Sequence, residues 1–321
     1  MPVESRVLSP KVRIVEVDEA YAGQRIDNFL LRELKGAPRS LIYRLLRKGE
    51  VRVNKGRIKA QYKLVAGDLV RIPPVRLEQR EAVPASDWLR RDIDAAIIFE
   101  DKRLIVLNKP AGIAVHGGSG ISNGVIEAMR ALRPEERQLE LVHRLDRDTS
   151  GCLLIAKKRS ALRALHELQR DGGIDKRYLA LVAGRPEKRR FEVKLALRKN
   201  TLKSGERVVR VDAEGKSAKT LFSLRETFDG FSLLEARLLT GRTHQIRVHL
   251  QSVGLPLVGD PKYGDDALNS RVAKQGFKRM FLHAERLRFR LPGDSDDMRI
   301  EAPLDAACAG LLVRLRSANQ A

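Results

Sequence analysis

The segment from His143 to Gly151 holds the residues of this chain that are best suited to chemistry. Asp146 lies there between Arg144 and Arg147, in a short polar stretch with apolar residues on both sides. Nearby guanidinium groups favour the ionised form of a carboxylate. An ionised aspartate that is held in place can act as a nucleophile, a base or a metal ligand. Charged residues in such a turn more often cap the backbone than catalyse, so the segment must be weighed with the motifs around it.

A second segment, residues 241–247, is dense in hydrogen-bond donors. Its structural interpretation is a helix that begins near residue 243 and is capped by Thr243. Its functional interpretation is an arginine, Arg242 or Arg247, that pairs with a carboxylate or a phosphate. The residues alone leave both interpretations open.

Other kinds of site have little support in this sequence. The glycine-rich loop at 116–120 lacks the following Gly-Lys-Ser/Thr of a phosphate-binding loop and does not have the dinucleotide-binding spacing. His244 and His249 are five residues apart, which does not place both imidazoles on one helix face. Asp146 and Asp148 could bind a divalent cation together, but the adjacent arginines would compete for them. We therefore expect neither a metal nor a cofactor.

The composition of the 321 residues indicates a polyanionic partner. The formal net charge is +21 and the isoelectric point is about 10.3. This surplus favours nucleic acid over an anionic membrane surface, because neither terminus is a basic amphipathic segment. Residues 1–80 carry a net charge of +9 and the remaining 241 carry +12. Nucleic-acid contact should therefore be strong in the N-terminal part without being confined to it.

The cysteines and the apolar runs bear on the compartment. Cys152 and Cys308 lie far apart in apolar surroundings, and no Cys-x-x-Cys pair exists. This pattern fits a reducing cytosol and argues against disulfides or a structural zinc site. The first residues lack an apolar signal core, and no apolar run has the length of a membrane span. We expect a soluble, cytoplasmic protein without a membrane partner.

Residues 12–76 are predicted to form a small α/β module. Apolar residues at helical spacing predict one helix over 26–34 and a second that ends at Gly49, followed by short strands around 51–53 and 69–72. The sequences GEVRVN at 49–54 and GDLVRI at 67–72 resemble the RNA-binding module named after ribosomal protein S-four. Between Lys35 and Lys63 there are ten basic residues and one acid, Glu50. We expect the RNA backbone to bind this basic face. Its expected contacts are Arg39, Arg44, Arg47, Lys48, Arg52, Lys55 and Arg57.

The rest of the chain is predicted to be a linker and a second domain. Residues 77–94 are polar, mixed in charge and contain Pro84, which is typical of a linker. A domain over 95–318 should hold strands near 97–99, 104–107, 178–182, 220–226, 231–239 and 281–290, with helices near 160–170 and 243–252. Because strands and helices do not alternate regularly, we expect an α+β fold with a mixed sheet rather than a doubly wound parallel one.

Four motifs together carry a resemblance. The segment 143–151, with LNKPAG at 107–112, KRYLALV at 176–182 and TGRTHQIRVH at 240–249, is similar to the signature of the RluA-type pseudouridine synthases. These enzymes modify ribosomal and transfer RNA. The resemblance implies a catalytic domain with a mixed, largely antiparallel central sheet. It also implies isomerisation of uridine to pseudouridine without a cofactor, since breaking the N1–C1′ bond and joining C5 to C1′ consumes nothing.

The resemblance also implies roles for individual residues. Asp146 becomes the catalytic aspartate, Arg247 its charge partner, and Tyr178 the active-site tyrosine that packs on the base and can act as a base in the last proton transfer. Ile246 would line the uracil pocket, and Arg144 would fill the gap that the flipped base leaves in the RNA. The resemblance further implies a smaller group of substrate-binding residues. These are Arg242, Lys109 and His143.

The expected substrate is a set of uridines in large-subunit (23S) ribosomal RNA, either free or in an assembling subunit, and the expected protein is a monomer. Three alternatives remain open: a transfer RNA pseudouridine synthase, a non-catalytic RNA-binding factor of ribosome assembly, and a metal-dependent enzyme that uses Asp146 and Asp148. Activity in EDTA would exclude the last of these. Loss of activity with intact RNA binding in Asp146→Asn would exclude the non-catalytic factor.

Overall fold

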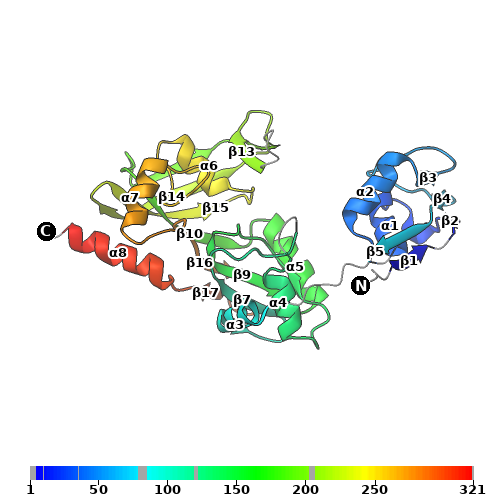
Figure 1. The fold of residues 1–321 in the computed structure, drawn as a ribbon, viewed down its shortest axis with the longest axis horizontal. Helices are drawn as coiled ribbons and strands as arrows, with labels where there is room; N and C mark the ends of the chain where they lie inside the picture. The colour runs from blue at the N-terminus through cyan, green and yellow to red at the C-terminus, as the bar shows by residue number, and fades with distance from the viewer. Residues whose placement is uncertain are drawn as a thin grey trace. The chain divides into compact units, whose positions relative to one another are not determined.

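The chain divides into two compact units, Met1–Ala82 and Val83–Ala321, which we call the N-terminal module and the C-terminal unit (Figure 1). The structure is a computed structural model that describes residues 5–9, 11–34, 36–78, 85–118, 122–201 and 207–319. Parts of three expectations lie outside these ranges. They are Lys35 of the basic run, residues 79–84 of the linker and residues 119–120 of the glycine-rich loop.

Two helices and an antiparallel three-stranded sheet, in the order β2-β4-β3, form most of the N-terminal module. The elements are β2 (Arg13–Glu16), η1 (Glu19–Tyr21), α1 (Ile26–Glu33), α2 (Arg39–Lys48), β3 (Arg52–Val53) and β4 (Leu69–Ile72). Phe29 and Leu30 of α1 and Ile42 of α2 are buried in one core, as the helical spacing of apolar residues predicts. Helix α2 ends at Gly49, whose φ of 69° suits a glycine, as predicted.

The module extends beyond the expected range of 12–76. Strand β1 (Ser5–Ser9) pairs antiparallel with β5 (Val75–Glu78) in a separate two-stranded ribbon. Pro73 and Pro74 separate β5 from β4, since proline cannot donate to a strand ladder. These prolines interrupt the strand pattern without ending the module.

A ten-stranded sheet is the scaffold of the C-terminal unit. Its main path runs β11-β14-β15-β10-β16-β9-β7-β6, with β17 paired to β16 and β8 paired to β9. All of these pairings are antiparallel except β16 with β9, so the expected mixed, largely antiparallel sheet is confirmed. The strands are β6 (Ile97–Glu100), β7 (Leu104–Lys109), β8 (Glu140–Leu141), β9 (Ser150–Ala156), β10 (Asp175–Ala183), β11 (Arg190–Lys194), β14 (Lys219–Phe228), β15 (Phe231–Leu238), β16 (Leu282–Phe289) and β17 (Met298–Glu301). A separate hairpin joins β12 (Leu197–Thr201) to β13 (Arg207–Val211).

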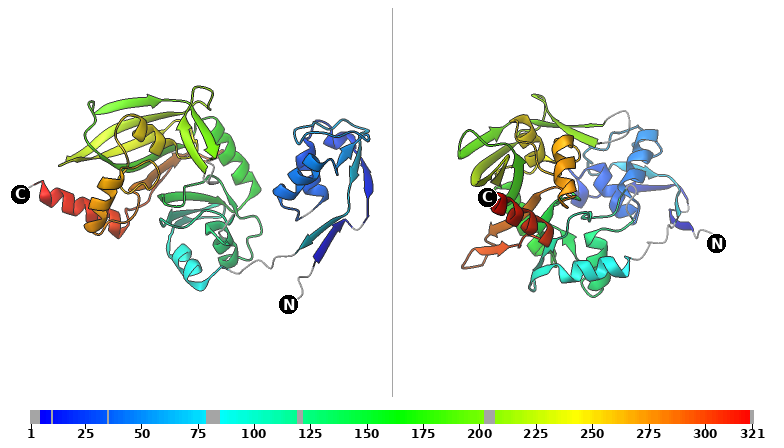
Figure 2. Two further views of the ribbon diagram at one scale, coloured as in Figure 1. Left: turned by 45° about the horizontal axis from the view of Figure 1, so that its top comes forward. Right: turned by 60° about the vertical axis from the view of Figure 1, so that its left-hand side comes forward.

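Six helices accompany this sheet. They are α3 (Asp87–Ala95), α4 (Val125–Leu132), α5 (Arg159–Arg170), α6 (Gln245–Ser252), α7 (Asp266–Lys274) and α8 (Ala306–Ala318). Helices α3 and α4 lie side by side in the views of Figures 1 and 2. None of the helices in the described ranges combines the length and the hydropathy that a membrane crossing requires.

Helix α3 corrects the prediction of a linker over 77–94. Leu89 and Ile93, four residues apart, face the core of the C-terminal unit, while Trp88 is exposed. The polar composition and Pro84 concealed this short amphipathic pattern. The segment over 87–94 is therefore part of the C-terminal unit, and β5 occupies the start of the expected linker.

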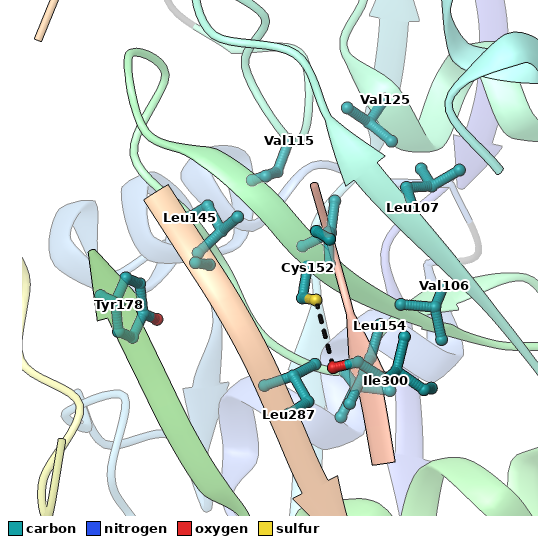
Figure 3. Packing of buried hydrophobic residues seen from close by; sticks show 14 of the residues in the cluster. Val106, Leu107, Val115, Val125, Leu145, Cys152, Leu154, Tyr178, Leu287 and Ile300 are labelled. Carbon is teal, nitrogen blue, oxygen red and sulfur yellow. Dashed lines mark hydrogen bonds between the residues drawn. The ribbon is translucent and has the colours of Figure 1, made fainter. Parts of the chain in front are cut away.

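The parallel pair β9–β16 lies at the centre of the core. All seven residues of β9 are buried. Gly151 has a φ of 105°, and a Cβ there would approach the carbonyl oxygen of Ala284 to 2.3 Å, so only glycine fits this crossing. Figure 3 shows the packing around Cys152, whose Sγ lies 3.8 Å from the carbonyl oxygen of Ile300. Burial raises the pKa of the Cys152 thiol to about 12, which keeps it protonated.

Candidate active site

Asp146 lies in the loop that joins β8 to β9. Leu145 anchors this loop in the core, where Figure 3 shows it in the same cluster as Tyr178. The amide of Thr149 donates to the backbone oxygen of Asp146 at 3.2 Å and closes the turn. The Asp146 side chain remains 28% exposed. The buried strand β9 thus fixes the loop, and the loop presents a carboxylate that solvent and ligands can reach.

The charge partner of Asp146 comes from helix α6. Nη1 of Arg247 lies 3.2 Å from Oδ2 of Asp146, although the two residues are 101 positions apart in the sequence. Nε and Nη2 of Arg247 donate to the two carboxylate oxygens of Asp260 at 2.7 and 2.8 Å. Asp260 is fully buried. Burial alone would raise the pKa of Asp260, but the Arg247 guanidinium outweighs it and lowers that pKa. Asp260 therefore fixes Arg247 in the orientation that meets Asp146.

Asp146 and Arg247 line a pocket of about 450 Å³. Tyr178 from β10, Ile246 from α6 and Leu282 from β16 supply an aromatic and apolar wall. Burial, and secondarily the charge of Asp146, raises the pKa of the Tyr178 phenol above its usual range. The other lining residues are Leu141, Val142, His143, Arg144, Leu145, Thr149, Gln169, Lys176, Leu238, Gly241, Arg242, His244 and Gln245. The pocket combines one carboxylate, several cationic side chains, and an aromatic and apolar wall.

The loop before α6 differs from the sequence-based expectation. The helix begins at Gln245 rather than 243, and Thr243 does not cap it, because the residue at the cap position is His244 in the left-handed conformation. The loop is clamped by Gln245, whose Oε1 accepts from Thr240 and from the Arg242 amide at 2.7 and 3.0 Å. Its Nε2 donates to the Lys219 carbonyl oxygen at 3.0 Å. The side-chain network of Gln245 replaces the expected threonine cap.

Lys109, expected at the substrate, lies beneath the loop instead. Its side chain is fully buried, and Nζ donates to the carbonyl oxygens of Pro110, Ile113 and Arg147 at 2.7, 2.8 and 3.0 Å. Burial lowers the pKa of Lys109 to about 7. The prediction that Lys109 binds substrate is therefore corrected: it does not line the pocket, and its bonds go to the turn at 110–113 and to Arg147, next to Asp146.

His143 lines the pocket but is largely buried. Its Nε2 accepts from the Leu154 amide at 3.2 Å, and burial lowers the pKa of His143 to about 3, so the ring is neutral. Arg144 and Arg242, by contrast, are exposed at the pocket. Arg242 is tethered by a bond from Nε to the carbonyl oxygen of Ser217 at 3.1 Å. The two arginines keep donors available to a ligand.

The arginine beside Asp146 in the sequence does not pair with it. Nε of Arg147 lies 3.2 Å from Oδ1 of Asp148 instead. The structure thus brings Asp146, Arg247, Tyr178, Ile246, Arg144, Arg242 and His143 together at one pocket. Sequence reasoning missed Asp260 and Gln245. The one signal for Asp260 is its place in a Gly-Asp-Pro turn after an apolar run.

The seven basic residues expected to bind RNA are all exposed in the N-terminal module. None of Arg39, Arg44, Arg47, Lys48, Arg52, Lys55 and Arg57 forms an ion pair with a carboxylate in the described part of the chain. Arg52 donates only to the Gly49 carbonyl oxygen, at 3.2 Å. These side chains therefore keep positive charge that phosphates can neutralise.

Comparisons with known proteins agree with this geometry. Residues 103–252 match the RNA pseudouridylate synthase family, and residues 24–70 match the S4 domain. The chain is 54% identical over 315 residues to ribosomal large subunit pseudouridine synthase C of Pasteurella multocida, covering 98% of this chain and 97% of that protein. It is 55% identical to the protein of the same name from Escherichia coli, covering 97% and 99%.

A solved structure shows the same fold. Human RNA pseudouridylate synthase domain containing 4 superposes with a TM-score of 0.59 at 26% identity, over 71% of this chain and 96% of that one. Human RNA pseudouridylate synthase domain containing 1 gives a TM-score of 0.53 at 26% identity, over 69% and 94%. Together with the pocket around Asp146, these matches show that the chain belongs to the RNA pseudouridylate synthase family.

Proposed function

We propose that this enzyme converts uridines of large-subunit ribosomal RNA to pseudouridine. The observation that carries the proposal is the ion pair of Asp146 and Arg247 at the edge of a pocket with an aromatic and apolar wall. Such a wall suits a planar uncharged base, and a carboxylate beside it suits attack at the sugar. The relatives at 54% and 55% identity, named for the large ribosomal subunit, support the choice of RNA.

Asp146 is the group we assign to the reaction itself. Among the residues that line the pocket it is the one carboxylate. Addition to the sugar and removal of a ribose proton both need an ionised carboxylate within reach. Arg247 presents its positive charge to that carboxylate at 3.2 Å, and Asp260 prevents Arg247 from turning away. The isomerisation balances, since the N1–C1′ bond that breaks is replaced by a C5–C1′ bond to the same sugar. The proton lost from C5 is matched by one gained at N1.

Tyr178 and Ile246 are assigned to contact with the base. Tyr178 presents a ring next to the carboxylate, and Ile246 supplies an apolar side of the pocket. The raised pKa of Tyr178 keeps its phenol neutral at rest. The phenol therefore serves as a packing surface and a hydrogen-bond donor more readily than as a base, in contrast to the role that the resemblance implied.

The exposed arginines are assigned to the RNA around the target. A target base must leave its stack, at a cost of roughly a few kcal/mol. Arg144 has the planar guanidinium that can stack in the gap and bind phosphate at once. Arg242 and the basic face of the N-terminal module would add backbone contacts that raise affinity without reading the base. We further propose that the protein acts in the cytoplasm as a monomer.

The test is pseudouridine mapping on unmodified large-subunit RNA in EDTA. Wild type should produce pseudouridine, and Asp146→Asn should produce none while it binds RNA with unchanged affinity. Asp148→Asn is the matched control, because its carboxylate lies two residues away and pairs with Arg147 instead of Arg247. Modification by Asp146→Asn would refute the assignment. If wild type modified neither this RNA, transfer RNA nor assembling subunits, the RNA-binding factor would become the better explanation.

A further inference from the structure

His244 has an unusual backbone at the edge of the pocket. Its φ of 55° and ψ of 20° lie in the left-handed region, which L side chains rarely adopt. Its carbonyl oxygen accepts the first helical bond of α6, from the Val248 amide at 3.0 Å. The next residue, Gln245, is clamped by the network described above. A strained conformation at a reacting site calls for a reason that concerns the side chain.

The imidazole of His244 is oriented by a buried tyrosine. Nδ1 of His244 lies 2.8 Å from the hydroxyl of Tyr263. That hydroxyl already accepts from the Val209 amide at 2.8 Å, and Tyr263 is only 5% exposed. The phenolic hydrogen needs an acceptor, and Nδ1 is the one available among the residues that the structure describes. This bonding assigns the tautomer of His244 in which the proton is on Nε2.

The Nε2–H group of His244 faces the reaction site. It lies 3.8 Å from Oδ2 of Asp146, beyond hydrogen-bond distance, and the side chain lines the pocket while 16% exposed. Burial lowers the pKa of His244 despite the opposing charge of Asp146, so the ring is neutral. Arg247 already directs Nε and Nη2 to Asp260 and Nη1 to Asp146. His244 therefore offers the pocket a fixed donor that the protein itself does not use.

We propose that His244 is a neutral hydrogen-bond donor to the uracil bound beside Asp146, and that Tyr263 is a positioning residue that acts through His244. The inference rests on the proposed function. When the N1–C1′ bond breaks, the electron pair stays on the base, and the uracil oxygens gain negative charge. A donor fixed in advance stabilises this charge without reorganisation. No proton leaves His244, because the hydrogen bond strengthens and relaxes as the charge appears and disappears.

The test compares single-turnover rates and RNA affinities of His244→Gln and His244→Asn. The amide nitrogen of glutamine reaches about as far as Nε2, whereas that of asparagine reaches only as far as Nδ1. Asparagine, however, tolerates the left-handed backbone better than glutamine does. If His244 supplies a donor, asparagine should lower the rate by roughly 10²-fold and glutamine by much less, both with unchanged RNA affinity. If His244 only shapes the backbone, the order reverses.

The second arm isolates Tyr263. Tyr263→Phe keeps the ring that packs 4.9 Å from the Arg247 guanidinium and removes only the hydroxyl. We expect a rate loss of about tenfold in the single variant and no added loss when it is combined with His244→Asn, because the two act as one unit. His249→Gln is the matched control. It lies on the same helix outside the pocket lining and bonds to the Leu195 carbonyl oxygen and to Thr220, whose hydroxyl also accepts from Gln245. It therefore reports any loss that runs through the Gln245 network rather than through the Nε2 donor of His244.

The outcomes separate the inference from the function on which it rests. An inactive wild type would remove the proposed function itself. An active wild type with a slow His244→Gln and a fast His244→Asn would overturn the inference alone, as would additive losses in the double variant. Rate losses matched by losses of RNA affinity would also overturn it. Thermal melts of each variant, read beside His249→Gln, exclude unfolding as the cause of a slow rate.

Discussion

Replacing Asp260 by asparagine tests how the site is built. Asp260 is fully buried, accepts two bonds from Arg247 and accepts two more from the amides of Lys262 and Tyr263 at 2.9 and 3.1 Å. Breaking a buried ion pair by removal of one partner costs about 3–5 kcal/mol, since the other charge stays buried. Asparagine keeps one acceptor oxygen, and Asp146 remains near Arg247. We therefore expect Asp260→Asn to lower the free energy of unfolding by about 3 kcal/mol, the lower end of this range.

The assay is urea unfolding of wild type and Asp260→Asn, followed through Trp88. Trp88 is the one tryptophan of the chain and lies in α3, so its fluorescence reports on the C-terminal unit. Asp297 provides the control, because it also bonds to two arginines, Arg288 and Arg290, but at the surface. Asp297→Asn should change stability little. Activity of Asp260→Asn should fall with stability, as Arg247 loses its fixed orientation.

The pH dependence of stability tests the direction in which folding shifts the pKa of Asp260. The pKa of Asp260 is lowered on folding, so its contribution to stability is full above the unfolded pKa, near 4. It is lost as the pH falls through the lower, folded value. The difference between wild type and Asp260→Asn should be constant above about pH 5 and shrink below pH 4. A loss of less than about 1 kcal/mol at pH 7, with full activity, would refute the view that this buried pair organises the site.

Three other changes probe other parts of the chain. Burial lowers the pKa of Lys109 to about 7, so between pH 7 and 10 the Lys109 amine holds its proton more tightly in the unfolded chain than in the folded one. The stability of wild type relative to Lys109→Met should therefore rise over this range. A difference that stays flat with pH in urea unfolding would contradict this. Gly151→Ala should lower the free energy of unfolding by about 3 kcal/mol or more in thermal or urea unfolding, because of its positive φ and the close Ala284 oxygen. Gly254→Ala is the control, since Gly254 has a φ of 71° but open space around it, and it should cost about 1–2 kcal/mol. Equal losses of stability in the two glycine variants would show that the positive φ alone, and not the contact with Ala284, sets the cost. Replacing Arg44, Arg47 and Lys48 together by alanine should lower the slope of log affinity against log salt by about 2, with little change in single-turnover rate at saturating protein; an unchanged slope would place the RNA elsewhere.

Local patterns anticipated much of the catalytic pocket. The residue types within 143–151 indicated Asp146, and the family resemblance implied Arg247 as its charge partner; the structure brings the two side chains to 3.2 Å. The end of helix α2 at Gly49 was predicted, since the apolar stripe and the glycine act over one or two turns. The helix end depends on neighbours in the sequence, so the sequence alone predicts it, whereas the pairing of Asp146 with Arg247 was expected from the family resemblance.

Features that depend on distant partners were not predicted. Lys109 carries a charge, and its sequence gives no hint that three carbonyl oxygens will surround it under a loop. Asp260 contributes to the site only through its bonds to Arg247, which lies on α6. The left-handed backbone of His244 has no signal in the residues around it, and Gln245, the next residue, is held by a partner as distant as Lys219. Helix α3 was missed because a nine-residue pattern with two core residues is too short to outweigh its polar composition.

The parallel pairing of β9 with β16 also sets an order of events during synthesis. Asp146 and β9 are synthesised early, but Gly151 of β9 can pack against Ala284 only after β16, which ends at residue 289, has been synthesised. The N-terminal module, complete at residue 78, buries a core of its own. At about 5–20 residues per second, roughly 10–40 s separate the two stages. We expect a nascent chain in that interval to bind RNA with no reaction site formed, and RNA-binding and activity assays on ribosome-bound chains stopped before residue 282 would check this order.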